Sequence, residues 1–417
     1  MGAPAGAGQR NCRALADAGG IDGVHRVSGG QQLQSVFVFP LLGGGGVTKR
    51  YGMFLSVLFC AFLCGLGALH LALPDRAWSE TENRTLAKRP DFTATSIADG
   101  TFMTDAEDYI ADQFPGRDGW TGLKARAEQL LGKSEFRGVY LCGDTLINRG
   151  DEPGEQAEKN LGYVSALAET AEVPVYLGLI PTASEIWADR LPAGAPVPNQ
   201  SAFIQRALEE TGLFGVDYLS ALQGRAGEKL YYRTDHHWTS LGAYYGYAAL
   251  CEALDEEAVS LDSFTPKTVS CDFNGTLYST SGVHWLTPDT MEYYVPEEGV
   301  TVTAPQGGGE ESLPLYDRSY LTKKDKYSSF LGGNRPECVV KNPNAATDRK
   351  ILLIRDSYAD AMAPFLSQTF AEVHLLDLRY YRLSPAEYAR ENGVDGIVVS
   401  YSVQNFVTDK NLVFLRR

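Results

Sequence analysis

The sequence has few basic residues. Its 417 residues include 37 Lys and Arg against 52 Asp and Glu, which gives a formal net charge of −15. Five basic residues and only two acidic ones lie in the first 50 positions, so the rest of the chain is more acidic still. An acidic surface repels phosphate backbones. The composition therefore argues against a nucleic acid as partner.

The sequence also lacks the usual metal-binding patterns. It has six His and seven Cys, but neither an HxxEH nor a CxxC spacing, which are typical of zinc sites. His236 and His237 are adjacent, and adjacent side chains point in divergent directions. We therefore predict no metal ion and no other cofactor.

The cysteines leave the redox state open. Cys12 lies in the N-terminal tail, and Cys60 and Cys64 lie in a long apolar run. The cysteines that remain are Cys142, Cys251, Cys271 and Cys338. Their spacing is compatible both with one or two disulfides and with free thiols.

The N-terminal part contains one long uncharged stretch. Residues 1–50, which are rich in Gly, Ala and Ser, are predicted to be a disordered cytoplasmic tail, or translated sequence upstream of the native start. No charged residue occurs between Arg50 and Asp75. At ~1.5 Å per residue, residues 51–74 are long enough to cross a bilayer as a helix. We favour a single-pass transmembrane anchor over a cleaved signal peptide.

The flanking charges predict the orientation of this anchor. Lys49 and Arg50 precede it, and Asp75 and Glu80 follow it. Basic residues favour the cytoplasmic side of a membrane. The N-terminus is therefore expected in the cytoplasm, and everything after residue 75 is expected outside.

The remaining chain has the pattern of an α/β protein. Residues 75–150 are predicted to form a helical stalk, with helices over 102–114 and 118–131, followed by a β-hairpin in GVYLCGDTLINR. Residues 151–417 alternate helices with apolar strands such as VPVYLGLIP, which is typical of a parallel sheet. A β-rich insertion is expected at about 260–347. Its aromatic residues either stack on sugar rings or pair within the core, and the second is the more common: Tyr278, Trp285, Tyr293 and Tyr294.

The stretch YYRTDHHWTSLGAYY, residues 231–245, holds the first candidate catalytic group. A helix is predicted to start at Thr239 or Ser240, because hydroxyl side chains cap free N–H groups. Asp235 and His237 then lie in the loop before it, where an aspartate can turn back to the imidazole. A histidine oriented by an aspartate is a general base that requires a nucleophile.

The stretch KILLIRDSYADAMAPFL supplies the candidate nucleophile. Ser357 falls where an apolar strand ends and a helix begins, so its hydroxyl is either exposed at the carboxyl edge of the sheet or is a simple helix cap. The ends of the following strands place Arg379, Tyr401 and Asn405 at the same edge. With Trp238, these are the candidate oxyanion-stabilising or substrate-binding residues.

Several motifs together carry a family resemblance. DHHW, FLGGN at 330–334, RDSYADAMAPFL and YSVQNF resemble the DHHW family, a branch of the SGNH-hydrolase-like proteins related to the alginate O-acetylation proteins AlgJ and AlgX. ENRTLAKRPDF and FPGRD resemble the membrane-proximal region of that group. The resemblance implies an SGNH-like (flavodoxin-like) α/β/α three-layer sandwich, with Ser357 as nucleophile, His237 as general base and Asp235 as its orienter. The role of His236 stays open. Arg355 stands where the common GDS block has glycine.

The expected function follows from this resemblance. It implies a membrane-anchored extracytoplasmic O-acetyltransferase that modifies a cell-envelope or exported polysaccharide through a serine acyl-enzyme. It also implies a membrane-bound O-acyltransferase partner that supplies acetyl groups. The alternatives are a carbohydrate acetylesterase of the same fold and a non-catalytic polysaccharide-binding or assembly protein.

Overall fold

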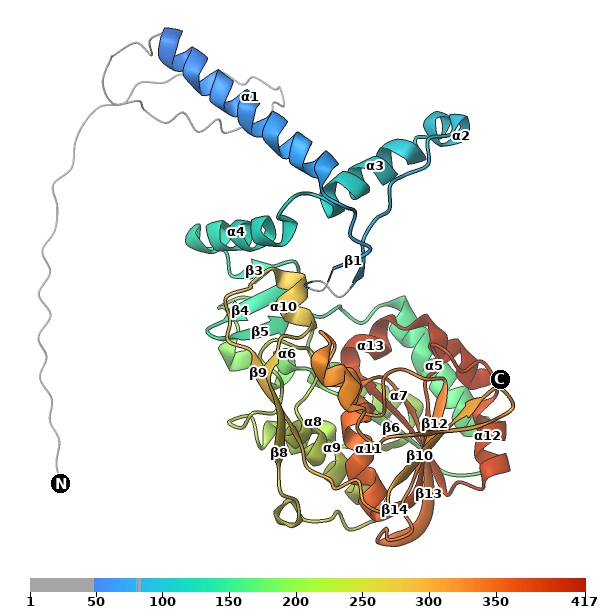
Figure 1. Ribbon diagram of the computed structural model, residues 1–417. Coiled ribbons are helices and arrows are strands. Elements are labelled where there is room, and N and C mark those ends of the chain that lie inside the picture. The colour runs from blue at the N-terminus through green and yellow to red at the C-terminus, as the bar shows by residue number, and fades with distance from the viewer. Residues whose placement is uncertain (1–48, 80, 82–83) are drawn as a thin grey trace, which may run out of the picture. The chain divides into compact units, whose positions relative to one another are not determined.

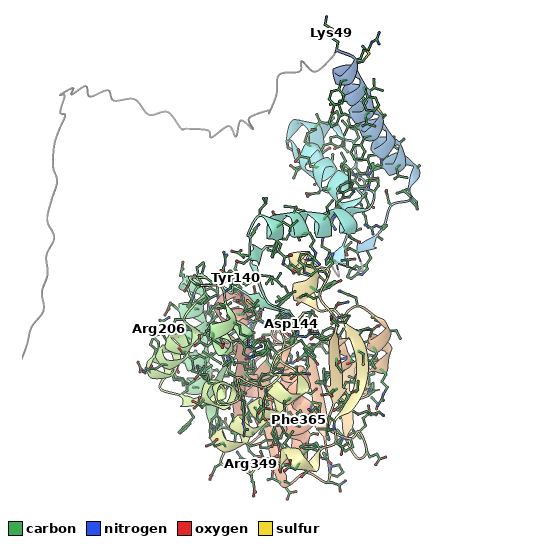
Figure 2. The ribbon with its side chains drawn as sticks, turned by 90° about the vertical axis from the view of Figure 1, so that its left-hand side faces the viewer. Lys49, Tyr140, Asp144, Arg206, Arg349 and Phe365 are labelled. Atoms are coloured by element: carbon green, nitrogen blue, oxygen red, sulfur yellow. The ribbon has the colours of Figure 1, made fainter. Side chains whose placement is uncertain are left out.

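The computed structural model describes residues 49–79, 81 and 84–417 (Figure 1). The predicted tail, apart from its last two residues, lies outside the described residues. Helix α1 spans Lys49–Ala72, with Lys49 at its start (Figure 2). This helix of 24 residues is long and apolar enough to cross a membrane, and none of its residues is buried.

The segment after α1 contains the two predicted helices. Strands β1 (Trp78–Ser79) and β2 (Arg84–Thr85) pair, and α2 (Ala94–Ala98) follows. Helices α3 (Thr101–Asp112) and α4 (Arg117–Leu130) confirm the predicted pair. The chain turns between them at Gly116, whose φ of 68° is accessible to glycine at little cost.

A small antiparallel sheet comes next. It consists of β3 (Glu135–Phe136), β4 (Val139–Cys142) and β5 (Thr145–Asn148). Strands β4 and β5 form the predicted hairpin, with Gly143 at a φ of 65° in its turn.

A large mixed sheet of eight strands forms the core of the C-terminal part of the chain, from residue 175 onward (Figure 1). Five of its strands are parallel and adjacent in the order β14 (Phe370–Leu376), β13 (Thr347–Arg355), β15 (Gly396–Ser402), β6 (Val175–Ile180) and β7 (Phe214–Gly215). The antiparallel strands β12 (Glu337–Lys341), β10 (Thr301–Gln306) and β11 (Gly309–Leu313) continue the sheet beyond β14. Every residue of β15 is buried, as expected for a strand covered on both faces.

The strand order explains why the aspartate–histidine pair precedes the serine in the sequence. If the parallel strands are counted from β13, their spatial order is 2-1-3-4-5, the flavodoxin-like order. In this chain, however, β6 and β7 come first. The sheet is therefore that of a flavodoxin-like fold whose chain starts at the fourth strand.

Helices cover both faces of this sheet. On one face, Leu352 and Ile354 of β13 pack in a core with side chains from α5 (Glu155–Thr170), α7 (Gln200–Thr211), α12 (Pro385–Asn392), α13 (Val403–Thr408) and η5 (Lys410–Arg416). On the other face, Ile351 and Leu353 pack with side chains from α6 (Ala183–Ile186), α8 (Tyr218–Gln223), α9 (Ser240–Ala253) and α11 (Tyr358–Thr369). A single turn of 3₁₀-helix, η1 (Ala188–Arg190), follows α6. The predicted three-layer α/β/α architecture is confirmed.

Residues 260–347 divide into two parts. After η2 (Leu261–Ser263), strands β8 (Lys267–Phe273) and β9 (Asp289–Tyr293) form a separate two-stranded sheet with α10 (Thr276–Ser281) between them. The second part supplies β10, β11 and β12 to the central sheet, with η3 (Arg318–Thr322) and η4 (Tyr327–Ser329) before β12. Tyr293 is 4% exposed and stacks on Tyr316 with ring centroids 3.9 Å apart, so its ring lies in the core.

The cysteines of the described residues are free thiols. Cys251 and Cys338 are buried, and Cys142 is half-buried. Cys271 is exposed on β8. Burial raises the pKa of the Cys142 thiol to about 11, which keeps it protonated at neutral pH.

Candidate active site

Ser357 lies between the end of β13 and the start of α11. It occupies the N-cap position of α11, yet its side chain makes no capping hydrogen bond. Its hydroxyl instead donates to Nε2 of His237, with Oγ and Nε2 2.8 Å apart. The position alone is typical of a simple helix cap, but the hydrogen bond is that of a serine paired with a base.

His237 and Asp235 lie in the loop before α9, as the sequence predicted. Thr239 caps that helix by accepting a hydrogen bond from the N–H of Gly242. The Nδ1–H of His237 donates to Oδ1 of Asp235 over 2.6 Å, and its backbone N–H donates to the same oxygen over 3.0 Å. This contact places the ring proton on Nδ1 and leaves Nε2 free to accept the serine proton.

The second oxygen of Asp235 is held by the start of α10. Oδ2 accepts the backbone N–H of Thr276 over 2.7 Å and its hydroxyl over 3.0 Å. Gly275 allows this approach, because a Cβ built there would lie 2.2 Å from the Cβ of Asp235. Burial alone would raise the pKa of Asp235, but the His236 and His237 rings and these hydrogen bonds hold it well below its usual range. Asp235 is therefore ionised at neutral pH.

Two aromatic side chains fix the histidine ring. Tyr327 of η4 stacks on the His237 imidazole, with centroids 3.7 Å apart and planes 8° apart. The hydroxyl of Tyr358 donates to the backbone carbonyl of His236. In return, the carbonyl of Tyr358 accepts the indole N–H of Trp238 over 2.9 Å. The loop that carries His237 is thus tied to the first residue of α11.

Asp356 connects the serine to the neighbouring strand. Its Oδ2 accepts the backbone N–H of Ser402 over 2.8 Å, the hydroxyl of Ser402 over 2.7 Å and the side-chain amide of Asn405 over 2.8 Å. Its Oδ1 accepts the N–H of Tyr358. Asn405 is therefore held beside the Ser357 turn, at the edge of the sheet where it was predicted.

A small pocket of about 30 Å³ lies beside these groups. His236 contributes to its wall, and the Nδ1 of His236 is 2.6 Å from the Thr276 hydroxyl. Desolvation and the neighbouring His237 lower the pKa of His236 to about 4, so its ring is neutral at pH 7. The other lining residues are Asn148, Thr182, Ala183, Ser184, Leu277, Tyr358, Ser402, Gln404 and Asn405.

Three other predicted side chains lie away from this pocket. Trp238 and Tyr401 are 0% and 1% exposed and pack in the cores on the two faces of the sheet. Arg379 donates to both oxygens of Asp377 and to the side-chain oxygen of Asn334, and it does not line the pocket. The structure thus brings together Ser357, His237, Asp235 and Asn405, and holds the other three in packing or ion pairing.

Arg355, which replaces the common glycine, points into the protein. It is 1% exposed and forms an ion pair with Asp360, with Nη2 and Oδ1 2.9 Å apart. Its Nη1 lies 3.8 Å from Asp377. The arginine therefore neutralises buried carboxylates beneath the turn and does not enter the pocket.

Asp235, His236 and His237 also have the composition of a metal-ligand group. Their nearest donor atoms all lie within 4.8 Å of one another. Both nitrogens of His237 and both oxygens of Asp235 are engaged in the hydrogen bonds described above. The arrangement has the geometry of a proton relay to Ser357.

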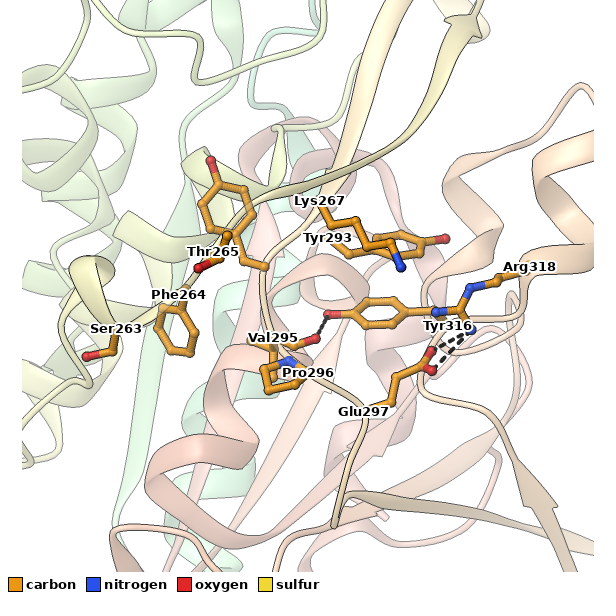
Figure 3. Close-up of a pocket in the computed structure, with 11 residues that line it drawn as sticks. Ser263, Phe264, Thr265, Lys267, Tyr293, Val295, Pro296, Glu297, Tyr316 and Arg318 are labelled. Carbon is orange, nitrogen blue, oxygen red and sulfur yellow. Dashed lines mark hydrogen bonds and ion pairs between the residues drawn. The ribbon is translucent and has the colours of Figure 1, made fainter.

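A larger pocket lies elsewhere and contains none of these groups. Its lining residues are Ser263, Phe264, Thr265, Lys267, Tyr293, Tyr294, Val295, Pro296, Glu297, Tyr316 and Arg318 (Figure 3). Arg318 pairs with Glu297 at its edge. Its volume of about 440 Å³ exceeds that of the pocket beside His236, but the groups capable of nucleophilic chemistry are at the edge of the sheet.

Comparison with known proteins decides the family. The DHHW protein family model matches residues 166–376, half of the chain. The chain belongs to the DHHW family. Two curated relatives of this DHHW protein are probable alginate O-acetylases AlgJ from Pseudomonas syringae pv. tomato and Pseudomonas putida, 24% and 23% identical over 49% and 51% of the chain. The matches cover 54% and 56% of those proteins, so the chain spans about half the length of the curated relatives it matches.

Solved structures have the same fold. A DHHW family protein from Eubacterium siraeum is 24% identical, with a TM-score of 0.58, and the match covers 67% of this chain and 95% of that one. PatB1 from Bacillus cereus, solved with a sulfonyl adduct, is 19% identical, with a TM-score of 0.54 and coverage of 66% and 97%. At these identities the likeness concerns the fold.

Sequence reasoning missed Gly275, Thr276, Tyr327 and Asp356. Asp356 had a visible signal, because it precedes the candidate serine. The Asn-Gly-Thr run at 274–276 is a turn signal, but nothing in it points to Asp235, which lies 41 residues earlier. Tyr327 lies in a polar, irregular segment and carries no periodic pattern.

Proposed function

We propose that this DHHW protein is a membrane-anchored O-acetyltransferase that modifies an exported or cell-envelope polysaccharide through an acetyl-serine intermediate. The observation that carries the proposal is the hydrogen-bonded chain from Ser357 through His237 to Asp235, with contacts of 2.8 and 2.6 Å. The AlgJ relatives support O-acetyl transfer as the reaction class.

In the first half-reaction Ser357 attacks the carbonyl carbon of the acetyl donor. His237 Nε2 takes the hydroxyl proton, and ionised Asp235 stabilises the imidazolium through Nδ1–H. The negative charge that develops on the carbonyl oxygen is stabilised by the Asn405 amide, which Asp356 orients. His237 then returns the proton to the leaving group, and acetyl-Ser357 forms.

In the second half-reaction a sugar hydroxyl attacks acetyl-Ser357. His237 removes the proton of that hydroxyl and passes it to Ser357 Oγ as the ester forms. The pocket beside His236 and Tyr358 holds the acetyl methyl group. Its small volume favours an acetyl over a longer acyl group.

Helix α1 anchors the proposed enzyme in the membrane. Lys49 and Arg50 at its start favour the cytoplasmic side, which places the α/β domain outside. Acetyl groups made in the cytoplasm must then cross the membrane. A multispanning acyltransferase partner that exports them would supply the donor.

The experiment measures acetyl transfer and acetyl release in parallel. Purified full-length protein is given a small acetyl ester and an oligosaccharide, and acetylated sugar and free acetate are both quantified. We expect acetylated sugar from the wild type and a rate lower by about 10⁴ or more for Ser357→Ala and His237→Ala. Acetate alone would identify an esterase. Wild-type transfer by folded Ser357→Ala would overturn the proposal.

A further inference from the structure

Helix α4 has an apolar stripe on its exposed side. Trp120, Leu123 and Leu130 recur at helical spacing, and Leu131 caps the helix on the same side. These side chains are 45%, 59%, 88% and 88% exposed. The opposite side contacts the protein through Ala125, which is 3% exposed in a small core. The helix therefore has two apolar sides. One packs against the protein, and the other is exposed to solvent.

This exposure is local to one part of the chain. Among the described residues after 131, the exposed large apolar side chains are Phe214, Tyr380 and Leu383. The other exposed side chains of this kind lie in α1, at Leu73 directly after it, and in the segment from Trp78 to Leu131, which includes Met103 and Ile110 of α3. Contiguous exposed apolar surface in a protein with a well-buried core indicates a contact that the isolated chain does not make.

Basic residues border the stripe. Lys124 and Arg126 lie on its two sides, and Lys133 follows the helix. Lys124 and Lys133 both pair with Glu128, which lies between them in the sequence. Residues 117–133 carry four basic and two acidic side chains, whereas the whole chain has a net charge of −15. Helices with an apolar side and basic margins lie in the interfacial layer of membranes, where the cations meet anionic headgroups and tryptophan is favoured.

Contacts connect α4 to the end of α1. Arg76, four residues after α1, lies 3.6 Å from Asp118 in the first turn of α4. The backbone N–H and C=O of Arg76 both bond to the side chain of Gln113, just after α3. The hydroxyl of Tyr109 donates to Asp75 over 2.7 Å. The first turn of α4 is thus held next to the residues at which the proposed membrane helix ends.

We propose that the stripe formed by Trp120, Leu123, Leu130 and Leu131 lies in the headgroup layer of the membrane that α1 crosses. It makes a second, peripheral membrane contact that restricts where the domain sits above the bilayer. This inference rests on the membrane-crossing role proposed for α1. The stripe contacts the lipid surface in this proposal. The experiment distinguishes this contact from binding to a partner protein.

The test uses the full chain reconstituted in phosphatidylcholine and phosphatidylglycerol vesicles, with and without lipids brominated near the headgroup. Trp120 is one of five tryptophans, so its emission is obtained as the difference between the wild type and Trp120→Phe. The matched control is Trp285→Phe, because the Arg126 guanidinium covers the Trp285 ring at 3.7 Å. We expect brominated lipid to quench Trp120 more than about twofold and Trp285 little. Leu123→Gln with Leu130→Gln should reduce the quenching of Trp120.

Flotation of the vesicles separates the two proposals. Protein that floats with its Trp120 unquenched would overturn the lipid contact, leave the anchor intact and assign the stripe to a protein partner. Protein that does not float with vesicles would overturn the anchor and the lipid contact together.

Discussion

The phenol ring of Tyr327 lies flat against the imidazole of His237, with ring centroids 3.7 Å apart and an angle of 8° between the planes. The imidazole is therefore held on one face by Tyr327 and at its two nitrogens by hydrogen bonds to Asp235 and Ser357. A base held in this way loses little entropy when it takes the serine proton.

The stack predicts different effects for two substitutions of Tyr327. Tyr327→Phe keeps the ring and loses only a long, 3.4 Å hydrogen bond to Tyr358, so kcat should stay within about threefold of the wild type. Tyr327→Ala removes the ring and opens a cavity, which should lower stability by about 3–5 kcal/mol. Its kcat should fall by at least about tenfold. Equal kcat for folded Tyr327→Ala and Tyr327→Phe would show that the stack does not position the base.

Asp235→Asn tests the electrostatic role of the aspartate. The amide keeps the size of the side chain but removes the charge that stabilises the imidazolium, and its N–H₂ favours the wrong tautomer of His237. We expect kcat to fall by about 10⁴ with unchanged folding. Steady-state rates on a small acetyl ester, with circular dichroism as the folding control, measure this. A loss below tenfold would remove Asp235 from the mechanism.

Gly275→Ala tests the close approach at the start of α10. The new methyl group would lie 2.2 and 2.3 Å from Cβ and Oδ2 of Asp235, so the carboxylate must move. We expect activity to fall by about 10² or more, because small displacements of a catalytic group are costly. The matched control is Gly162→Ala on the exposed side of α5, where nothing lies within 4 Å. The control should keep full activity and gain about 0.5–1 kcal/mol of stability.

The pocket predicts selectivity for short acyl groups. The small pocket of about 30 Å³ is the proposed position of the acetyl methyl group. The kcat/KM for acetyl esters should exceed that for butyryl esters by at least about tenfold, since extra methylenes in a filled site are costly. Leu277→Ala should narrow this ratio because Leu277 lines the pocket. Leu141→Ala, in the same small core but outside the pocket, should leave the ratio unchanged.

Buried His374 predicts a loss of stability in acid. Burial lowers its pKa to about 4, below the value of about 6.5 in the unfolded chain. Between these pH values the unfolded state binds the proton and the folded state does not, so stability falls as pH falls from about 6.5 to 4. The midpoint of thermal unfolding should drop over this range, and His374→Gln should flatten the drop. If the unfolding midpoint of the variant falls with pH as steeply as that of the wild type, groups other than His374 cause the acid sensitivity.

The sequence predicted the layers of the fold because strands such as β6 and β15 are continuous apolar runs and alternate with helices. It predicted the meeting of His237 and Ser357 through motifs and strand-end position, although 120 residues separate them. Long-range packing, which the sequence does not show, decides where the other candidate side chains lie. Trp238 and Tyr401 have the chemistry of substrate-binding residues, but they fill the cores on either side of the sheet.

Other parts of the site depend on contacts that no local pattern encodes. Arg379 follows a strand, as expected of a site residue. Its guanidinium, however, donates hydrogen bonds to Asp377, two positions earlier. Thr276 holds Asp235 only because the β8–β9 segment folds back onto the histidine loop. Arg355 is buried in an ion pair with Asp360, five positions later, which the local sequence does not reveal.

The central claim is that Ser357 carries the acetyl group. The most direct measurement is rapid-quench mass spectrometry of the full-length protein mixed with a chromogenic acetyl ester and no acceptor. We expect a burst of one acetyl group per chain on the peptide that contains Ser357. This burst should be absent from Ser357→Ala, and added oligosaccharide should discharge the acetyl group. Acetyl transfer to the oligosaccharide by folded Ser357→Ala at the wild-type rate, or an acetyl group on another residue that turns over at that rate, would contradict the central claim.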